Sequence, residues 1–145
     1  AALVDAARGT LSFSATPSGK PRVKVKRILV VDDVAITREL ERSILESAGY
    51  QVDTAVDGQD ALEKLRAREY DLIVADVEMP RMDGLELATV VKSDPILKQL
   101  PIVIVSSRES PEDRRKGLEI GVQAYVGKGS FDQMTLLDTI ESLIG

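Results

Sequence analysis

The chain has 145 residues, of which 43% are hydrophobic and 30% charged, and this balance suits one folded domain with its own core. Its 24 acidic residues outnumber its 19 basic ones, so the net charge of -5 gives no reason to expect DNA, RNA or an anionic membrane as a partner. Cysteine and histidine are absent, which excludes disulfides, thiolate chemistry and imidazole-dependent triads and argues against a zinc site.

Residues 1–25 differ in composition from the rest of the chain. An apolar fragment, Ala1–Ala7, precedes a stretch rich in serine, glycine, proline and basic residues, which is typical of a solvated linker. The chain starts without methionine, which fits a processed chain or a piece of a longer polypeptide. We expect residues 1–25 to be a linker, or the tail of a preceding domain, and residues 26–145 to fold as one domain.

From Arg27 onward, a strand followed by a helix repeats five times. The expected strands are Ile28–Val31, Gln51–Ala55, Leu72–Ala75, Ile102–Val105 and Ala124–Val126. The expected helices are Ala35–Ala48, Gln59–Arg68, Leu85–Lys92, Pro111–Ile120 and Phe131–Leu143. Gly49 and Gly121 fit helix C-termini, and Ser110 and Ser130 fit N-caps. No apolar run approaches the ~20 residues that span a bilayer and no signal peptide is recognised, so we expect a cytoplasmic protein without membrane insertion.

Strict alternation of strands and helices predicts an α/β fold with a doubly wound parallel sheet, right-handed crossovers and helices on both faces. The second strand, Gln51–Ala55, mixes polar and apolar residues and suits an edge, whereas the first, third and fourth strands are unbroken apolar runs. A strand order of 2-1-3-4-5 satisfies this pattern and places the topological switch point between strands one and three.

The third strand ends at a carboxylate, Asp76. Pro80, Asp83 and Gly84 then supply turn and N-cap chemistry before the next helix. In open α/β sheets ligands bind outside the carboxyl ends of the strands, so Asp76 lies where a functional group is expected. With the predicted strand order, Asp76 faces the end of the first strand.

Four strand ends bring reactive groups to this edge: the pair Asp32 and Asp33 after strand one, Asp76, Ser106 after strand four and Lys128 after strand five. The paired acids could instead only cap the following helix, and Lys128 taken alone could be a solvated side chain. Three converging carboxylates repel one another unless a cation lies between them, and Mg²⁺ prefers oxygen ligands. Together, Mg²⁺, a hydroxyl and an ammonium group could bind phosphoryl oxygens and leave one carboxylate as the nucleophile.

The same residues, in their sequence context, resemble the receiver domain of bacterial two-component response regulators. The matching motifs are Val30-Val31-Asp32-Asp33, Asp76 with Met79-Pro80-x-Met82-Asp83-Gly84, Ser106, and Lys128 after Ala124-Tyr125, within a stretch from about Arg27 to the C-terminus. This resemblance implies a flavodoxin-like (βα)₅ fold in which Asp76 accepts a phosphoryl group from the phosphohistidine of a histidine kinase or phosphotransfer domain. It also implies that Asp32 or Asp33, Asp76 and the backbone carbonyl of Glu78 bind Mg²⁺, and that Ser106 and Lys128 contact the phosphoryl oxygens. Such a domain assists its own phosphorylation and later hydrolysis.

The resemblance further predicts regulatory residues. Ser106 and Tyr125 would form the switch, and the surface of the fourth helix, fifth strand and fifth helix would be the docking face for a downstream protein partner. Glu78 and Arg108 would tune the lifetime of the phosphoryl group, either as an ion pair across the mouth of the site or as two separately solvated side chains. Gly129 stands where many receivers have a proline with a cis bond, so a cis bond is not carried over.

The stretch Val126–Gln133 most resembles the receiver at the C-terminus of chemotaxis-type hybrid histidine kinases, with Ala1–Ala7 as the end of a coupling-type domain. The alternative within the same fold is a stand-alone, single-domain chemotaxis response regulator. From another class, an FMN-binding flavodoxin-like protein needs a hydroxyl- and glycine-rich phosphate loop and flavin-lining aromatic residues, which this chain does not offer. A hydrolase of the aspartyl-phosphate type carries its pair of acids after the first strand, whereas Asp76 and Glu78 follow the third.

Overall fold

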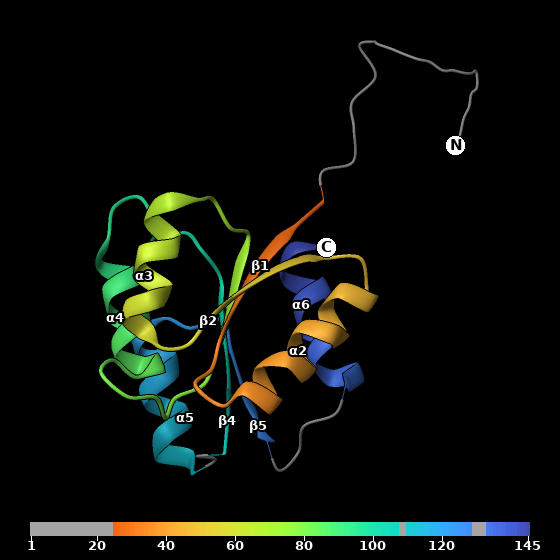
Figure 1. Cartoon of the computed structure of the whole chain (residues 1–145). Coiled ribbons are helices and arrows are strands. Elements are labelled where there is room, and N and C mark those ends of the chain that lie inside the picture. Colours follow the sequence, from red (N-terminus) through yellow and green to blue (C-terminus); the bar gives the residue numbers. More distant parts are fainter. Residues whose placement is uncertain (1–24, 108–109, 129–132) are drawn as a thin grey trace, which may run out of the picture.

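Five parallel strands form one central sheet with helices packed on both faces (Figure 1). The structure is a computed structural model that describes residues 25–107, 110–128 and 133–145. The strands are β1 (Arg27–Val31), β2 (Gln51–Ala55), β3 (Leu72–Ala75), β4 (Ile102–Ser106) and β5 (Ala124–Gly127). The helices are α2 (Ala35–Ser47), α3 (Gly58–Ala67), α4 (Gly84–Ser93), α5 (Pro111–Ile120) and α6 (Gln133–Ile144). The strand order β2-β1-β3-β4-β5 confirms the prediction.

Alternate residues of each strand supply the two halves of the core. In β1, Ile28 and Val30 pack on the side of α2 and α6, whereas Leu29 and Val31 pack on the side of α3, α4 and α5 (Figure 1). All four side chains are fully buried. Burial of an aliphatic side chain of this size contributes about 1.5–3 kcal/mol, so the central strands are firmly held where their carboxyl ends emerge.

The ends of the elements coincide with the predictions or differ from them by one residue, except at the start of the last helix. Both α3 and α4 begin one residue early, at Gly58 and Gly84, because each glycine directly follows an aspartate, Asp57 or Asp83, whose side chain caps the helix. Glycine has no side chain to contribute to the spacing of apolar residues. The helix predicted from that spacing therefore starts one residue after the observed helix. Gly49 follows α2 with a φ of 99°, as expected for a helix C-terminus.

Other predictions at element ends have mixed outcomes. Ser110 caps α5 by accepting a hydrogen bond from the Asp113 N–H, and Gly121 ends this helix with a φ of 113°. Ser130, the predicted cap of the last helix, and Phe131, its predicted first residue, lie outside the described residues, as do residues 1–24 of the predicted linker. None of the helices in the described part of the chain has the length and apolarity that crossing a bilayer requires.

Gly84 fixes how the chain leaves the end of β3. A Cβ atom at this position would lie 2.1 Å from the carbonyl oxygen of Asp76. The Gly84 N–H donates to the carbonyl of Val77 at 2.9 Å. The first turn of α4 therefore packs directly against the backbone of Asp76, an approach that only glycine permits.

Candidate functional site

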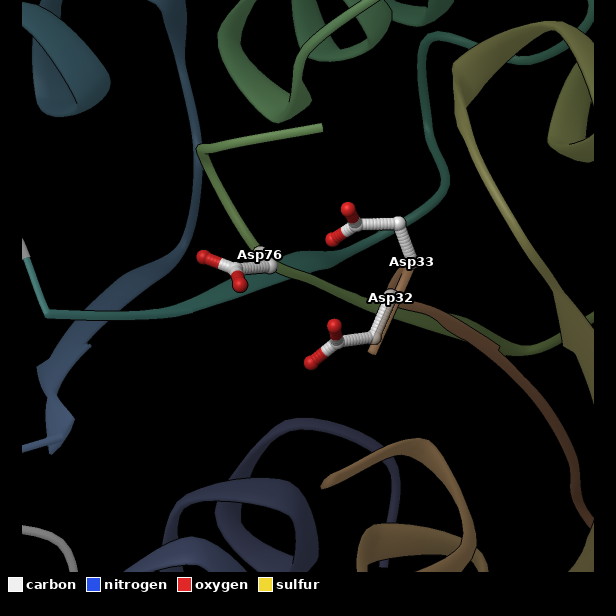
Figure 2. A group of neighbouring side chains, drawn as sticks. All are labelled: Asp32, Asp33 and Asp76. Atoms are coloured by element: carbon white, nitrogen blue, oxygen red, sulfur yellow. The ribbon is translucent and has the colours of Figure 1, made fainter. Parts of the chain in front are cut away.

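Three carboxylates meet at the carboxyl edge of the sheet. Each of Asp32, Asp33 and Asp76 offers an oxygen, and these oxygens all lie within 4.8 Å of one another. The register of β1 and β3, which pairs Val31 with Ala75, brings the following residues side by side, and Figure 2 shows the three side chains extending from these neighbouring strand ends. Asp32 and Asp76 are buried, with 1% and 8% of their surface exposed, whereas Asp33 is exposed.

Lys128 provides a positive charge for this cluster. Its Nζ donates to Asp76 Oδ2 at 3.0 Å and lies 3.6 Å from Asp32 Oδ2. Burial disfavours the ammonium form, but the hydrogen bond to Asp76 and the neighbouring carboxylates outweigh burial and raise the pKa of Lys128. Lys128 is thus a protonated partner of the cluster, and the alternative of a merely solvated lysine is wrong.

The Asp32 carboxylate is held by the backbone N–H of Val34, two residues further along the chain. Its Oδ1 accepts a hydrogen bond from the Val34 N–H at 2.9 Å. Val34 is the N-cap of α2 and has no side-chain cap among the described residues, so the alternative that Asp33 caps this helix is wrong. Burial raises the pKa of Asp32, while the Val34 N–H and then Lys128 oppose the shift.

The donor set fits a hard divalent cation. Asp32 Oδ2 is buried and has no hydrogen-bond partner within residues 25–107, 110–128 and 133–145. Three carboxylates face one ammonium group, so the cluster carries more negative than positive charge. All of the candidate ligand atoms are oxygens, which Mg²⁺ prefers. A bound Mg²⁺ would provide a ligand bond for the oxygen that lacks a hydrogen bond, and it would reduce the repulsion between the acids.

The predicted switch residues lie on the neighbouring strands. Ser106 ends β4, is fully buried and pairs in register with Gly127, the residue before Lys128. Tyr125 lies on β5 and is 7% exposed. The Arg114 guanidinium lies 5.4 Å from the centre of the Tyr125 ring and donates to the Tyr125 carbonyl at 2.8 Å. The structure therefore places Ser106 at the carboxyl end of β4 and Tyr125 on the adjacent strand, in contact with Arg114 of α5.

Glu78 lies beside the cluster through its backbone. Its N–H donates to Asp76 Oδ1 at 3.4 Å. Its exposed side chain accepts a hydrogen bond from the Ser107 hydroxyl at 3.4 Å. Arg108 lies outside the described residues, so the ion pair between Glu78 and Arg108 stays a prediction.

Sequence reasoning missed Glu41 on α2. This residue is 3% exposed, and the charges of Asp32, Asp76 and Lys128 act on its carboxyl group. Burial, with a smaller contribution from the charge of Asp32, raises the pKa of Glu41 to about 8. The available signal was its position four residues before the core residue Leu45, which places an acid on the buried face of an amphipathic helix.

Residues 28–141 match the family described as the response regulator receiver domain. The chain belongs to this family. Receiver domains accept a phosphoryl group on an aspartate in an acidic, Mg²⁺-binding pocket, and they take it from histidine kinases or phosphotransfer proteins. The match confirms the predicted family and flavodoxin-like fold, and it favours the receiver prediction over the FMN-binding and hydrolase alternatives.

Two curated relatives place this receiver domain in proteins of different length. The chain is 42% identical over 123 residues to the gliding motility regulatory protein of Myxococcus xanthus, covering 85% of this chain but only 16% of that protein. It is 32% identical over 116 residues to the protein PilG of Pseudomonas aeruginosa, covering 80% of this chain and 85% of PilG. The same domain thus forms a small part of one relative and most of the other.

Solved structures agree with the fold and with the chemistry of the family. The chemotaxis protein CheY4 of Vibrio cholerae superposes with a TM-score of 0.77 at 34% identity, covering 83% of this chain and 99% of that one. The response regulator TrrA of Thermotoga maritima, in complex with Mg²⁺ and BeF, gives a TM-score of 0.73 at 35% identity, covering 82% of this chain and 99% of that one.

Proposed function

We propose that Asp76 is the phosphoryl acceptor of this receiver domain. The observation that carries the proposal is the contact of Asp76 Oδ2 with the ammonium group of Lys128 at 3.0 Å. Asp76 also has an oxygen within 4.8 Å of an oxygen of each of the two neighbouring carboxylates. A carboxylate oxygen of Asp76 attacks the phosphorus of a phosphohistidine. The new bond joins this oxygen to phosphorus, the phosphorus–nitrogen bond breaks, and the electron pair stays on the imidazole nitrogen.

The neighbouring groups have distinct roles in this reaction. Asp32, Asp33, Asp76 and the backbone carbonyl of Glu78 would hold Mg²⁺, which would neutralise negative charge on the transferring group. Lys128 binds a phosphoryl oxygen, an assignment supported by its contact with the acceptor. The buried Ser106 hydroxyl, at the end of β4, donates to another phosphoryl oxygen.

Phosphorylation would switch a surface for a downstream protein partner. The charge on Asp76 draws the Ser106 hydroxyl towards it, and Tyr125 repacks behind it. The contacts of Arg114 with the ring and the carbonyl of Tyr125 connect this residue to α5. The readout surface would then comprise α5, β5 and α6.

The names of the relatives support a chemotaxis-like phosphorelay, and we propose that it operates in the cytoplasm. CheY4 is a chemotaxis protein, and the Myxococcus xanthus relative regulates gliding motility by its printed name. That relative is several times longer than the part matched by this chain, which supports a receiver within a longer protein. The longer protein we propose is a hybrid histidine kinase, with residues 1–25 as the connection. PilG, of which the chain covers 85%, supports the stand-alone alternative.

Intact mass spectrometry after incubation with acetyl phosphate tests the acceptor. The wild-type chain should gain one phosphoryl group with Mg²⁺ and none with EDTA, and Asp76→Asn should gain none. Asp83→Asn is the matched control, because asparagine keeps the N-cap of α4 and only a carboxylate in the same loop is lost. Labelling of Asp76→Asn at the wild-type level would contradict the proposal.

A further inference from the structure

The loop between β3 and α4 is fastened to the N-terminus of α3. Arg81 in this loop forms an ion pair with Asp57, the N-cap of α3. The Gly58 N–H donates to the Met82 carbonyl at 3.2 Å. The Met82 side chain occupies the space beside Gly58, where a Cβ atom would lie 2.6 Å from Met82 Cγ. Two loops that are far apart in sequence are therefore joined next to the phosphorylation site.

Asp57 is the buried partner in this junction. Its residue is only 2% exposed, although it belongs to no part of the acidic cluster at Asp76. One carboxylate oxygen accepts the Asp60 N–H at 2.9 Å and caps α3, and the other accepts from Arg81. The Asp60 N–H, together with Arg81, holds the pKa of Asp57 below its usual value. A buried, ionised carboxylate is destabilising without such partners. The positive charge of Arg81 therefore compensates the negative charge of Asp57.

The backbone of Arg81 is held in an unfavourable conformation. Its φ is 65°, and Arg81 is the only residue other than glycine with a positive φ among the described residues. Conformations of this kind persist where surrounding contacts fix them, and they are frequent at functional sites. The loop also carries Glu78, whose N–H donates to Asp76 Oδ1.

We propose that Asp57 and Arg81 are positioning residues of the phosphorylation site. Their ion pair fixes the loop so that the Glu78 carbonyl faces the three carboxylates, although neither residue touches the phosphoryl group. The inference rests on the proposed function, because the Glu78 carbonyl is assigned there as a Mg²⁺ ligand. Loss of the ion pair lets the loop leave this position, which weakens Mg²⁺ binding and slows phosphorylation.

Two substitutions remove the ion pair and keep the local fold. Asp57→Asn keeps a side-chain oxygen that caps α3 and removes only the charge. Arg81→Gln removes the charge on the other side. Each variant should raise the Mg²⁺ dissociation constant by about tenfold. This is near the low end of the loss in metal affinity that follows when a group that orients a metal ligand is replaced. The double variant should be no weaker than either single variant, because both break the same interaction.

The Mg²⁺ dissociation constant is measured from ¹H–¹⁵N chemical shifts of residues 76–78, and the phosphorylation rate from intact mass with acetyl phosphate. Arg81→Lys restores a cation and should recover much of the affinity. Arg68→Gln is the matched control, since it removes an ion pair with Asp53 beside the far end of α3 and should leave the wild-type dissociation constant. Thermal unfolding in EDTA reports any general destabilisation.

Wild-type Mg²⁺ affinity and phosphorylation rate in Asp57→Asn and Arg81→Gln would overturn the inference. An equal loss in Arg68→Gln would overturn it as well, because the effect would then not depend on this junction. Failure of the proposed function has a different signature, since the wild-type chain itself would then not bind Mg²⁺ or not be labelled on Asp76.

Discussion

Replacement of Glu41 by glutamine should stabilise the protein at neutral pH. Glu41 is 3% exposed and lies on the buried face of α2. Burial raises its pKa to about 8 from an ordinary value of 4.5, with the charges of Asp32 and Asp76 adding to the shift and Lys128 opposing it. At pH 7 the folded protein therefore keeps Glu41 protonated, whereas the unfolded chain releases the proton.

The sign and size of the effect follow from proton linkage. Because the pKa of Glu41 is higher in the folded state, its contribution to stability is present below the unfolded pKa and is lost as the pH rises towards 8. Each pH unit in this window lowers the free energy of unfolding by about 1.4 kcal/mol, so wild type should lose about 2.5 kcal/mol relative to Glu41→Gln between pH 5 and pH 7. Glutamine has the same shape and no proton to lose.

Urea denaturation at pH 5 and pH 7, in EDTA to remove divalent cations, measures this difference. Glu41→Gln and wild type should be of similar stability at pH 5, and the variant should be more stable at pH 7. Glu39→Gln is the control on the same helix, because Glu39 is half exposed and pairs with Arg42, so its replacement should change the free energy of unfolding by less than about 1 kcal/mol at either pH. A difference between Glu41→Gln and wild type that does not grow with pH would refute the reasoning.

Three further predictions concern residues around the site. Arg108→Ala and Glu78→Ala should each shorten the half-life of the phosphoryl group, measured by loss of label, with little change in thermal stability. Unchanged half-lives would contradict the predicted ion pair. Gly84→Ala should lower the free energy of unfolding by about 3 kcal/mol in urea, since a methyl group there meets the backbone carbonyl of residue 76 at 2.1 Å; wild-type stability would mean that this contact is not tight. The ring signals of Tyr125 in NMR spectra should shift on addition of beryllofluoride and Mg²⁺, and identical spectra would argue against its role in the switch.

The strand order could be predicted because the strands differ in polarity. Gln51–Ala55 carries polar residues that suit an edge, and β2 is indeed paired on one side only, with β1. The meeting of Asp32, Asp33 and Asp76 followed from this order, since carboxyl ends of neighbouring parallel strands share one edge. These features depend on local patterns that the sequence displays directly.

Other features of the site depend on contacts that no local pattern reveals. Asp57 and Arg81 are 24 residues apart, and their pairing follows only from how two loops pack together. The helical spacing between Glu41 and Leu45 indicates a buried position, but the charges around Glu41, at the ends of β1 and β5, are not visible in its neighbours in sequence. Helix starts at Gly58 and Gly84 were missed because glycine carries no pattern of its own.

The most direct test of the account is the chemical location of the phosphoryl group. Borohydride reduces an aspartyl phosphate to homoserine, so peptide mapping after phosphorylation and reduction identifies the acceptor residue. We predict homoserine at position 76 in the wild-type chain treated with Mg²⁺ and acetyl phosphate, and no homoserine in a sample treated with EDTA. Homoserine at position 32 or 33, or labelling that does not require Mg²⁺, would contradict the assignment of Asp76 as the acceptor.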